Sequence, residues 1–285
     1  MPSAQYKIFS RFVSLLSFKN RINLLYFRRF GRFPNLNKPV SFNEKMQRYK
    51  ITNRSSLLTV AADKLQSKKM VESICLDDIY IPKTIWETSN VEDIMELDLT
   101  SLPKNYVFKA NHTSQTIHII RDSNHLSKSL MMKDASSWMK HDQATVLGEW
   151  AYKNIPPKVF IEEFLDFQGH EPDDYKFFVY HGKVHFIQLD QDRFSNHKRN
   201  MFDSQWNDLG FDYSYPRKIP VPAKPVYLDK MVDIAEKIGK QFEFVRVDLY
   251  WFKDRVTFGE LTIYPGAGYE KFPSKDLDLL FGEPW

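Results

Sequence analysis

The sequence predicts an α+β fold built from two subdomains. Helical patterns fill the chain as far as Ser73, and strand-like segments then alternate with single helical stretches. Two short turns, His181–Gly182 and Lys253–Asp254, each join a pair of strand-like segments. Turns of two residues join antiparallel strands, because parallel strands need a long crossover. Mixed helices and antiparallel hairpins in this order indicate two α+β units.

The composition is that of a folded protein with a substantial core. The chain has 285 residues, of which 42% are hydrophobic and 27% charged, whereas disordered chains are poor in apolar residues. A single cysteine, Cys75, excludes an internal disulfide and a zinc site made of several cysteines. The sequence shows neither an apolar run of about 18 residues nor a secretory signal pattern. We therefore expect a cytoplasmic protein.

The first 60 residues differ from the rest in charge. They hold twelve Lys or Arg and one acid, Glu44, whereas the remaining residues hold 28 basic and 35 acidic side chains. Within them, residues 6–30 alternate apolar and basic positions at helical spacing. This helix either packs on the protein or, through residues 1–30, contacts an anionic membrane at its inner face. No nucleic-acid-binding motif accompanies the basic residues, so no nucleic acid is expected as partner.

Helix signals continue after the prolines at 34 and 39. Ser41 followed by Glu44 predicts a capping box for a helix that ends near Thr52. Another helix is predicted from Ser56 to Ser73.

Strand patterns begin near residue 105. Residues 105–110 and 116–121 form a predicted hairpin, and residues 126–152 have helical spacing. Further strands are predicted at 158–165, 174–181, 183–190, 242–251 and 255–264, with a helix at 228–241. The division that follows is a basic helical segment (1–60), a helical and linker lead-in (61–104), and two subdomains (105–165 and 166–285).

The last hairpin carries a candidate metal site. Side chains in a strand alternate between two faces, so Arg246, Asp248 and Tyr250 share one face of the first strand. Phe258, Glu260 and Thr262 are expected to share a face of the second. The two-residue turn puts Asp248 and Glu260 on facing strands, close enough to share a cation, and two carboxylates suffice for Mg²⁺ when phosphate oxygens complete its shell. The alternative is a pair of surface acids.

Lys109 is a candidate phosphate ligand. A lysine within the apolar segment VFKA needs a partner for its ammonium group, and a phosphate oxygen is a suitable one. The polar turn 111–115, which includes Ser114, offers N–H groups and hydroxyls but no glycine. The alternative is a lysine whose ammonium group reaches solvent.

A third group of residues surrounds the strand at 158–165. Glu162 and Glu163 are followed by Phe164 and Leu165, which offer apolar walls for a flat ring. The next predicted strand brings Asp174 and Lys176 onto one face. Carboxylates for a metal and cations around a transferred group are what phosphoryl transfer requires.

In this order, the pieces resemble an ATP-grasp enzyme and, more narrowly, the TupA-like ATP-grasp family associated with teichuronopeptide and surface-polysaccharide synthesis. The phrases that carry the resemblance extend over nearly the whole chain: PVSFNEKMQRYK (39–50), AADK (61–64), IPPKVFIEEFL (155–165), DYKFFVYHGKVHFIQLDQDR (174–193), FVRVDLY (244–250) and FGELT (258–262). The implied fold has two α+β subdomains that hold a nucleotide between antiparallel sheets.

The resemblance implies a set of ATP and Mg²⁺ ligands. Lys64 and Lys109 would contact the ATP phosphates, residues 162–165 would frame the adenine, and Asp174, by a looser match, would meet the ribose. Ser114 of the polar turn is a further candidate phosphate contact. Asp248 and Glu260 would hold Mg²⁺. Two departures stand out: Thr262 replaces the asparagine expected two residues after the second metal carboxylate, which makes it a weaker third ligand, and NHTSQ replaces a glycine-rich loop.

The implied activity is that of a carboxylate–amine ligase that forms an acyl phosphate and releases ADP. Its substrates would be an amino acid, or another amine, and a sugar acid or amino sugar of a bacterial surface polysaccharide such as a capsule or O-antigen. Arg246, Lys176 and Arg193 are candidates to hold the carboxylate or the transferred phosphoryl group. Alternatives are a kinase of the same glycan, a glycosyltransferase using Asp190–Gln191–Asp192, and a non-catalytic glycan- or membrane-binding protein.

Overall fold

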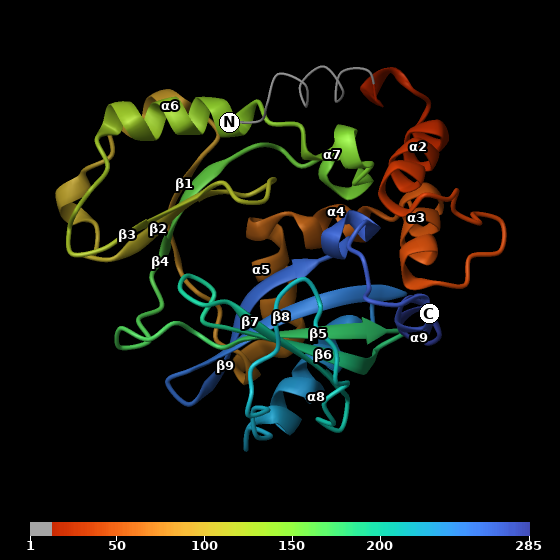
Figure 1. The fold of residues 1–285 in the computed structure, drawn as a ribbon. Helices are drawn as coiled ribbons and strands as arrows, with labels where there is room; N and C mark the ends of the chain where they lie inside the picture. Colours follow the sequence, from red (N-terminus) through yellow and green to blue (C-terminus); the bar gives the residue numbers. More distant parts are fainter. Residues whose placement is uncertain (1–12) are drawn as a thin grey trace.

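The computed structural model describes residues 13–285 and contains two antiparallel β-sheets with helices around them (Figure 1). The strand order is β1-β4-β2-β3 in the four-stranded sheet and β7-β6-β5-β8-β9 in the five-stranded sheet. The predicted α+β class and the predicted hairpins are confirmed. The part of the predicted first helix at residues 6–12 lies outside the described residues.

The elements have the following bounds. The strands are β1 (Thr84–Thr88), β2 (Tyr106–Ala110), β3 (Ile117–Ile120), β4 (Val159–Glu163), β5 (Asp174–Tyr180), β6 (Lys183–Gln191), β7 (Lys198–Asp203), β8 (Phe244–Phe252) and β9 (Arg255–Thr262). The α-helices are α2 (Phe18–Phe30), α3 (Phe42–Thr52), α4 (Ser56–Ala62), α5 (Lys64–Cys75), α6 (Lys128–Met139), α7 (Gln143–Leu147), α8 (Leu228–Gly239) and α9 (Lys275–Gly282).

Three helices that the spacing predicts as continuous are broken by capping residues. Ser17 interrupts the first and caps α2, and Gly148, in the left-handed conformation, ends α7 within the predicted helix 126–152. Asp63 divides the helix predicted from Ser56 to Ser73. Its backbone is extended and its carboxylate accepts from the N–H groups of Leu65 and Gln66. An N-cap residue has a non-helical backbone, so apolar periodicity alone misses these breaks.

The predicted capping box at Ser41 is half formed. The Ser41 hydroxyl accepts from the Glu44 N–H at 3.4 Å. The Glu44 carboxylate, however, turns to the preceding loop, where it accepts from the N–H of Asn35 and pairs with Arg32. Glu44 of α3 therefore holds the loop that joins α2 to α3.

Three elements of the structure were not predicted from the sequence. β1 lies within residues 61–104, which were expected to be a helical and linker lead-in, and it pairs with β4 in the four-stranded sheet. β7 is an edge strand rich in polar residues, and α9 is a short helix near the C-terminus. The four-stranded sheet thus begins before residue 105.

The five-stranded sheet has one apolar face and one mixed face, on which Asp174 and Lys176 of β5 are followed by the buried aromatics Phe178 and Tyr180. Along β5, Tyr175, Phe177 and Val179 belong to the main hydrophobic core. The buried side chains of α8 pack in the same core. The alternate positions, Asp174 and Lys176, point to the opposite face and are also buried. Burial of these charges is costly unless each has a partner.

Tyr80 ties the two sheets together. Its N–H donates to the carbonyl of Val256 and its carbonyl accepts from the N–H of Phe258, so its backbone continues the edge of the sheet beyond β9. Its hydroxyl donates to the carboxylate of Glu163 at the end of β4. The end of β4 is thereby fixed relative to β9.

Helix α3 holds the loop that follows β9. Gln47 donates its amide to the carbonyls of Ala267 and Gly268, at 3.2 and 2.7 Å. The ammonium group of Lys50 donates to the carbonyls of Ala267 and Leu147, at 2.9 and 2.8 Å. Burial lowers the pKa of Lys50 to about 7, although the nearby Glu149 carboxylate opposes this. The main chain behind β9 therefore depends on the N-terminal helices.

Candidate active site

Two lysines bind one buried carboxylate beside the inner strands of the four-stranded sheet, and a third lysine lies close by. Lys64 and Lys68 lie one turn apart at the start of α5, and Lys109 lies on β2. Lys109 Nζ is 2.5 Å from Glu162 Oε1, and Lys68 pairs with the other oxygen of the same carboxylate. Lys64 donates to the carbonyl of Thr113. We call Lys64, Lys68, Lys109 and Glu162 the lysine cluster.

The lysine cluster is electrostatically unbalanced. Burial would raise the pKa of Glu162, but the ammonium groups of Lys109 and Lys68 outweigh it and hold that pKa below its ordinary value. Burial lowers the pKa of both Lys64 and Lys68 despite the carboxylates near them. Lys68 and Lys109 share the Glu162 carboxylate, and Lys64, which Glu260 and Asp63 also influence, adds a third ammonium group nearby. Such a group of cations can accept an added anion, and a phosphate group is suitable.

The turn between β2 and β3 is fixed by hydrogen bonds in place of glycines. The Asn111 side chain donates to the Asp63 carboxylate and accepts from the Lys158 N–H. Both ring nitrogens of His112 are engaged, with the Asn111 side chain and with the carbonyl of Trp138. His112 is thus a structural residue of the turn, whereas Ser114 is exposed and contacts Gln143 at 3.5 Å.

The predicted pairing of Asp248 with Glu260 is present in the last hairpin. The two residues are direct cross-strand partners on β8 and β9, so their side chains leave the same face of the sheet. Immediately beside them the register shifts, because Gly259 forms a bulge. A Cβ on Gly259 would lie 2.8 Å from the Asp248 carbonyl oxygen, so the close approach of the strands requires glycine.

The bulge corrects one expectation from the sequence. Phe258 pairs with Leu249 and is buried in the apolar core. It therefore does not share a face with Glu260 and Thr262, as strict alternation would require. The Glu260 side chain, in contrast, is about half exposed.

Asp248 is the centre of a buried charge network. Arg246 donates to both of its carboxylate oxygens at 2.7 Å, and Lys176 Nζ lies 2.7 Å from Oδ2. Arg246 also donates to the hydroxyl of Thr262 at 2.9 Å. Burial would raise the pKa of Asp248, but these two cations outweigh it and lower the pKa.

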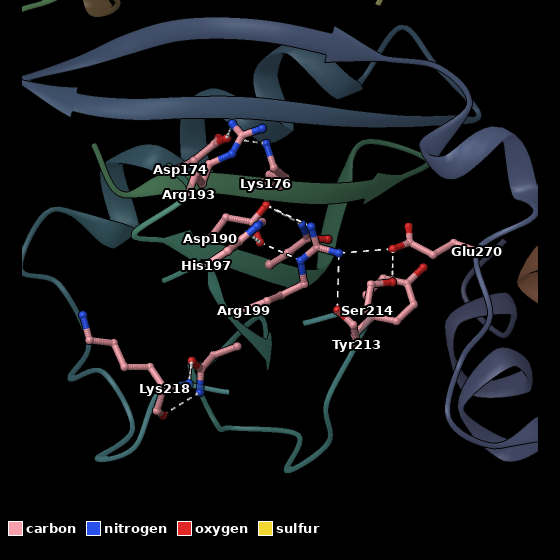
Figure 2. A network of polar contacts seen from close by, with 12 residues as sticks. Asp174, Lys176, Asp190, Arg193, His197, Arg199, Tyr213, Ser214, Lys218 and Glu270 are labelled. Carbon is pink, nitrogen blue, oxygen red and sulfur yellow. Dashed lines mark hydrogen bonds and ion pairs between the residues drawn. The ribbon is translucent and has the colours of Figure 1, made fainter. Parts of the chain in front are cut away.

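Lys176 links Asp248 to Asp174 on the neighbouring strand. Its ammonium group lies 2.6 Å from Asp174 Oδ2, and Arg193 pairs with the same carboxylate (Figure 2). Burial would lower the pKa of Lys176, but the two carboxylates outweigh it and raise the pKa. We call Asp174, Lys176, Arg193, Arg246, Asp248 and Glu260 the acid–base cluster; its three cations match its three carboxylates.

The two clusters lie near each other. Glu260 is close enough to Lys64 to offset part of the effect of burial on the lysine pKa. Lys64 of the lysine cluster and Glu260 of the acid–base cluster are therefore the point of approach, where α5 packs against β9. This is the arrangement that a triphosphate and its metal ion need.

The donor set fits Mg²⁺. Among residues 13–285 no group of three or more His, Cys, Asp or Glu side chains gathers in a way that could hold a metal by itself. Asp248 and Glu260 offer two hard oxygen ligands, and Mg²⁺ takes one or two carboxylates together with phosphate oxygens and water. Thr262 is a weaker candidate, because its hydroxyl already accepts from Arg246.

The residues expected around the adenine lie at the end of β4. Glu162 points into the lysine cluster, while Glu163 accepts from the Tyr80 hydroxyl. The Phe164 ring is half-buried beneath the guanidinium of Arg121, 5.0 Å away. Leu165 is also half-buried. These side chains border the point where the chain leaves the four-stranded sheet.

A second network extends the charged part of the mixed face to the edge strand β7. Asp190 pairs with Arg199 through both oxygens, at 2.6 and 3.1 Å, and Arg199 reaches Glu270 at 3.2 Å (Figure 2). Ser214 also donates to Glu270. His197 Nε2 lies 3.3 Å from Asp190 Oδ1 without hydrogen-bond geometry, and its ring stacks on Tyr215.

Several of these residues have weak signals in the sequence. Lys68 follows Lys64 by four residues, a helical spacing that places both on one face and could have identified it. Glu270 lies in a loop without a recognisable pattern, and only the fold brings it to Arg199. Tyr80 likewise reaches Glu163 across 83 positions.

The Asp190–Arg199 pair predicts a pH dependence of stability. Burial would raise the pKa of Asp190, but hydrogen bonds and charge from Arg199 lower it to about 2. A depressed pKa stabilises the folded state above the ordinary value near 3.8, and this contribution is lost as the pH falls toward 2. Wild type should gain about 2 kcal/mol of unfolding free energy across this range. Denaturant titrations should show that wild type gains about 2 kcal/mol more than Asp190→Asn across this range, because other carboxylates with lowered pKa contribute equally to both; equal gains would contradict the prediction.

Comparison of the sequence with the profiles of known families identifies the family of the chain. The sequence profile of the TupA-like ATPgrasp family matches residues 44–285, which include both clusters and every strand. The chain belongs to the TupA-like ATP-grasp family. Its two antiparallel sheets with flanking helices are those of the ATP-grasp fold, and ATP-grasp enzymes use ATP and Mg²⁺. No curated protein matches the chain in sequence.

Solved structures similar to this ATP-grasp chain include three ligases. D-Alanine–D-alanine ligase from Helicobacter pylori aligns with 14% identity and a TM-score of 0.44, covering 79% of this chain and 61% of the ligase. Phosphoribosylamine–glycine ligase from Thermotoga maritima aligns with 14% identity and a TM-score of 0.45, covering 77% and 54%. D-alanine–D-alanine ligase from Bacillus anthracis, complexed with ATP, aligns with 18% identity and a TM-score of 0.41, covering 73% and 55%. The chain thus spans between about half and two thirds of these ligases.

Proposed function

We propose that the chain is a Mg²⁺- and ATP-dependent carboxylate–amine ligase. The observation that carries the proposal is the pairing of Asp248 with Glu260 beside Arg246 and Lys176, with the lysine cluster close by. This combination supplies carboxylates for a metal and cations for phosphate groups at one place. Membership of the ATP-grasp family supports it.

Each cluster has a separate task in this proposal. Lys64 and Lys109 bind the ATP phosphates, and Ser114 closes over them from the neighbouring turn. Lys68 contacts Glu162 and positions that carboxylate next to Lys109. Glu162 is already bound to Lys68 and Lys109. The adenine is therefore framed by Glu163, Phe164 and Leu165. Asp174 contacts the ribose.

Mg²⁺ would be held by Asp248 and Glu260. When bound, it neutralises phosphate charge and orients the triphosphate. Thr262 then serves chiefly to orient Arg246, to which its hydroxyl is hydrogen-bonded.

The reaction has two steps. A substrate carboxylate oxygen attacks the γ-phosphorus of ATP, the bond from that phosphorus to the bridging oxygen breaks, and ADP leaves with the electron pair. The amine nitrogen then attacks the carbonyl carbon of the acyl phosphate, phosphate leaves, and the nitrogen loses a proton to form the amide. Arg246, Lys176 and Arg193 provide positive charge next to the transferred phosphoryl group, which lowers the barrier of such steps.

For the substrates, we propose an amino acid or other amine and a carboxylated sugar of a bacterial surface polysaccharide, joined in the cytoplasm. The network beyond Arg193 supports a polar, ring-shaped substrate. Ser214 is exposed, Glu270 is partly exposed, and the Tyr215 ring is exposed over about two fifths of its surface. Hydroxyl groups can bond to the first two, and a sugar ring can pack on an aromatic side chain.

The proposal is tested by product analysis. MgATP is incubated with the protein, each of the standard amino acids, and free or nucleotide-linked uronic acids and amino sugars. We expect ADP to appear only when an amine and a carboxylate are both present, and mass spectrometry to find an amide. A phosphorylated sugar would identify a kinase instead. No ADP with any pair, combined with absence of MgATP binding by calorimetry, would favour a non-catalytic binding protein.

A further inference from the structure

The outer side of α2 and the loop after it present two aromatic rings to solvent. The helix buries Ile22 and Leu25 against the protein, and Phe27 points away from them because successive residues are about 100° apart around a helix. Phe27 is 46% and Phe33 64% exposed, and their rings stack on each other at 4.9 Å. We call Phe27, Phe33 and the basic side chains around them the α2 surface.

The charge of this region is of one sign. Residues 13–43 contain six Lys or Arg and no Asp or Glu. Lys19, Arg28, Arg29, Arg32 and Lys38 are exposed, and Arg48 of α3 donates to the carbonyls of Leu36 and Asn37 in the same loop. Glu44, the acid nearest in sequence, is buried and paired with Arg32. The α2 surface is therefore basic as well as aromatic.

We propose that the α2 surface docks on an anionic lipid bilayer. Basic side chains attract the acidic headgroups, and exposed aromatic rings insert at the boundary between headgroups and acyl chains. A soluble acidic polymer would use the cations but would gain less from two adjacent phenyl rings. Among residues 13–285 no helix is long and apolar enough to cross a membrane, so the contact proposed is a peripheral one.

The α2 surface lies near one side of the candidate site, which relates the proposed docking to the proposed function. Helix α2 lies at one edge of the molecule, beside α3 (Figure 1). Arg29 Nε donates to the carbonyl of Tyr269 at 2.8 Å, next to Glu270 of the network that includes Arg199. If the proposed function holds, a glycan attached to a membrane lipid would meet the site from this edge.

The test is vesicle flotation of the full-length protein without ATP. Wild type is compared with the double variant Phe27→Ser/Phe33→Ser and with the control Val226→Ser, whose side chain is fully exposed in a distant loop. Vesicles contain phosphatidylcholine alone or with phosphatidylglycerol. We expect wild type and the control to bind phosphatidylglycerol vesicles, the double variant to bind about tenfold more weakly, and salt to weaken all binding.

The outcomes separate this proposal from its rivals. Equal binding of wild type to both vesicle types, or no binding, overturns it. Undiminished binding of the double variant assigns any membrane contact to other residues and also overturns it. Binding to a soluble anionic polysaccharide that competes fully with vesicles and is unaffected by Phe27→Ser/Phe33→Ser favours the polymer. Because the assay needs neither ATP nor product, its failure leaves the ligase proposal standing, and circular dichroism confirms that the variants are folded.

Discussion

Asp248→Asn is expected to abolish Mg²⁺-dependent ATP chemistry and also to destabilise the fold. The carboxylate is 1% exposed and holds Arg246 and Lys176. Removing its charge leaves two buried cations short of a partner, a change that costs about 3 kcal/mol or more. Loss of one metal ligand and disorder of both cations should lower the rate of ADP release by about a thousandfold or more. Denaturant unfolding and ADP-release assays measure the two effects.

Glu260→Gln is the matched variant that separates these effects. Glu260 is the cross-strand partner of Asp248, yet its side chain is 48% exposed and lies 3.9 Å from Arg246. We expect a similar loss of Mg²⁺ dependence but a change in unfolding free energy below about 1 kcal/mol, because exposed ion pairs contribute little. If Glu260→Gln unfolds as easily as Asp248→Asn, or keeps full activity, the two-carboxylate metal site is wrong.

Lys109→Met is expected to weaken MgATP binding by about 10- to 100-fold. Its ammonium group lies in the lysine cluster, and loss of one charged hydrogen bond to phosphate corresponds to about 1.4–2.8 kcal/mol. The fold should survive, because Glu162 keeps its contact with Lys68 and methionine retains the apolar stem of the side chain. Isothermal titration calorimetry with MgATP measures the change.

The control for Lys109→Met is Lys158→Met. Lys158 also lies beside the four-stranded sheet, but its ammonium group pairs with Glu87 near the surface. Its replacement should leave MgATP affinity within about twofold. Equal weakening by both variants would mean that general positive charge, and not the lysine cluster, attracts the nucleotide.

The sequence predicted the parts of the fold in which side-chain periodicity and turn chemistry agree. The hairpins at His181–Gly182 and Lys253–Asp254 form as expected, because each turn residue has the left-handed backbone that such turns require. Helix ends were missed at Asp63, where a cap interrupts an otherwise continuous apolar pattern. β1 was missed because the alternation along it is weak: three of its five residues are exposed.

For the candidate site, the hairpin of β8 and β9 could be predicted, but its exact register at Asp248 and the partners of each charge could not. The two-residue turn places Asp248 and Glu260 on facing strands, but turn length alone would pair Asp248 with Gly259, and the bulge brings Glu260 opposite Asp248. The binding of Lys109 to Glu162, in contrast, depends on the pairing of β2 with β4, which are separated by about 50 residues. The bulge at Gly259 was also missed, since a glycine in a strand has several explanations until its neighbours are known.

The attachment of α3 to the loop after β9 bears on how substrate choice could be altered. Gln47 and Lys50 bind carbonyl oxygens of that loop, so they recognise its main chain and not its side chains. Gly266 and Gly268 must remain, because both are left-handed and closely packed. Ala267 is buried with a left-handed backbone, and the Tyr269 ring lies 4.4 Å from the Lys50 ammonium group, so both belong to the attachment. The Glu270 side chain, in contrast, bonds to Arg199 and Ser214, so it can change without loosening the contacts of Gln47 and Lys50. Related enzymes could therefore vary position 270, and a library built on that position should retain folded protein while sampling new acceptors.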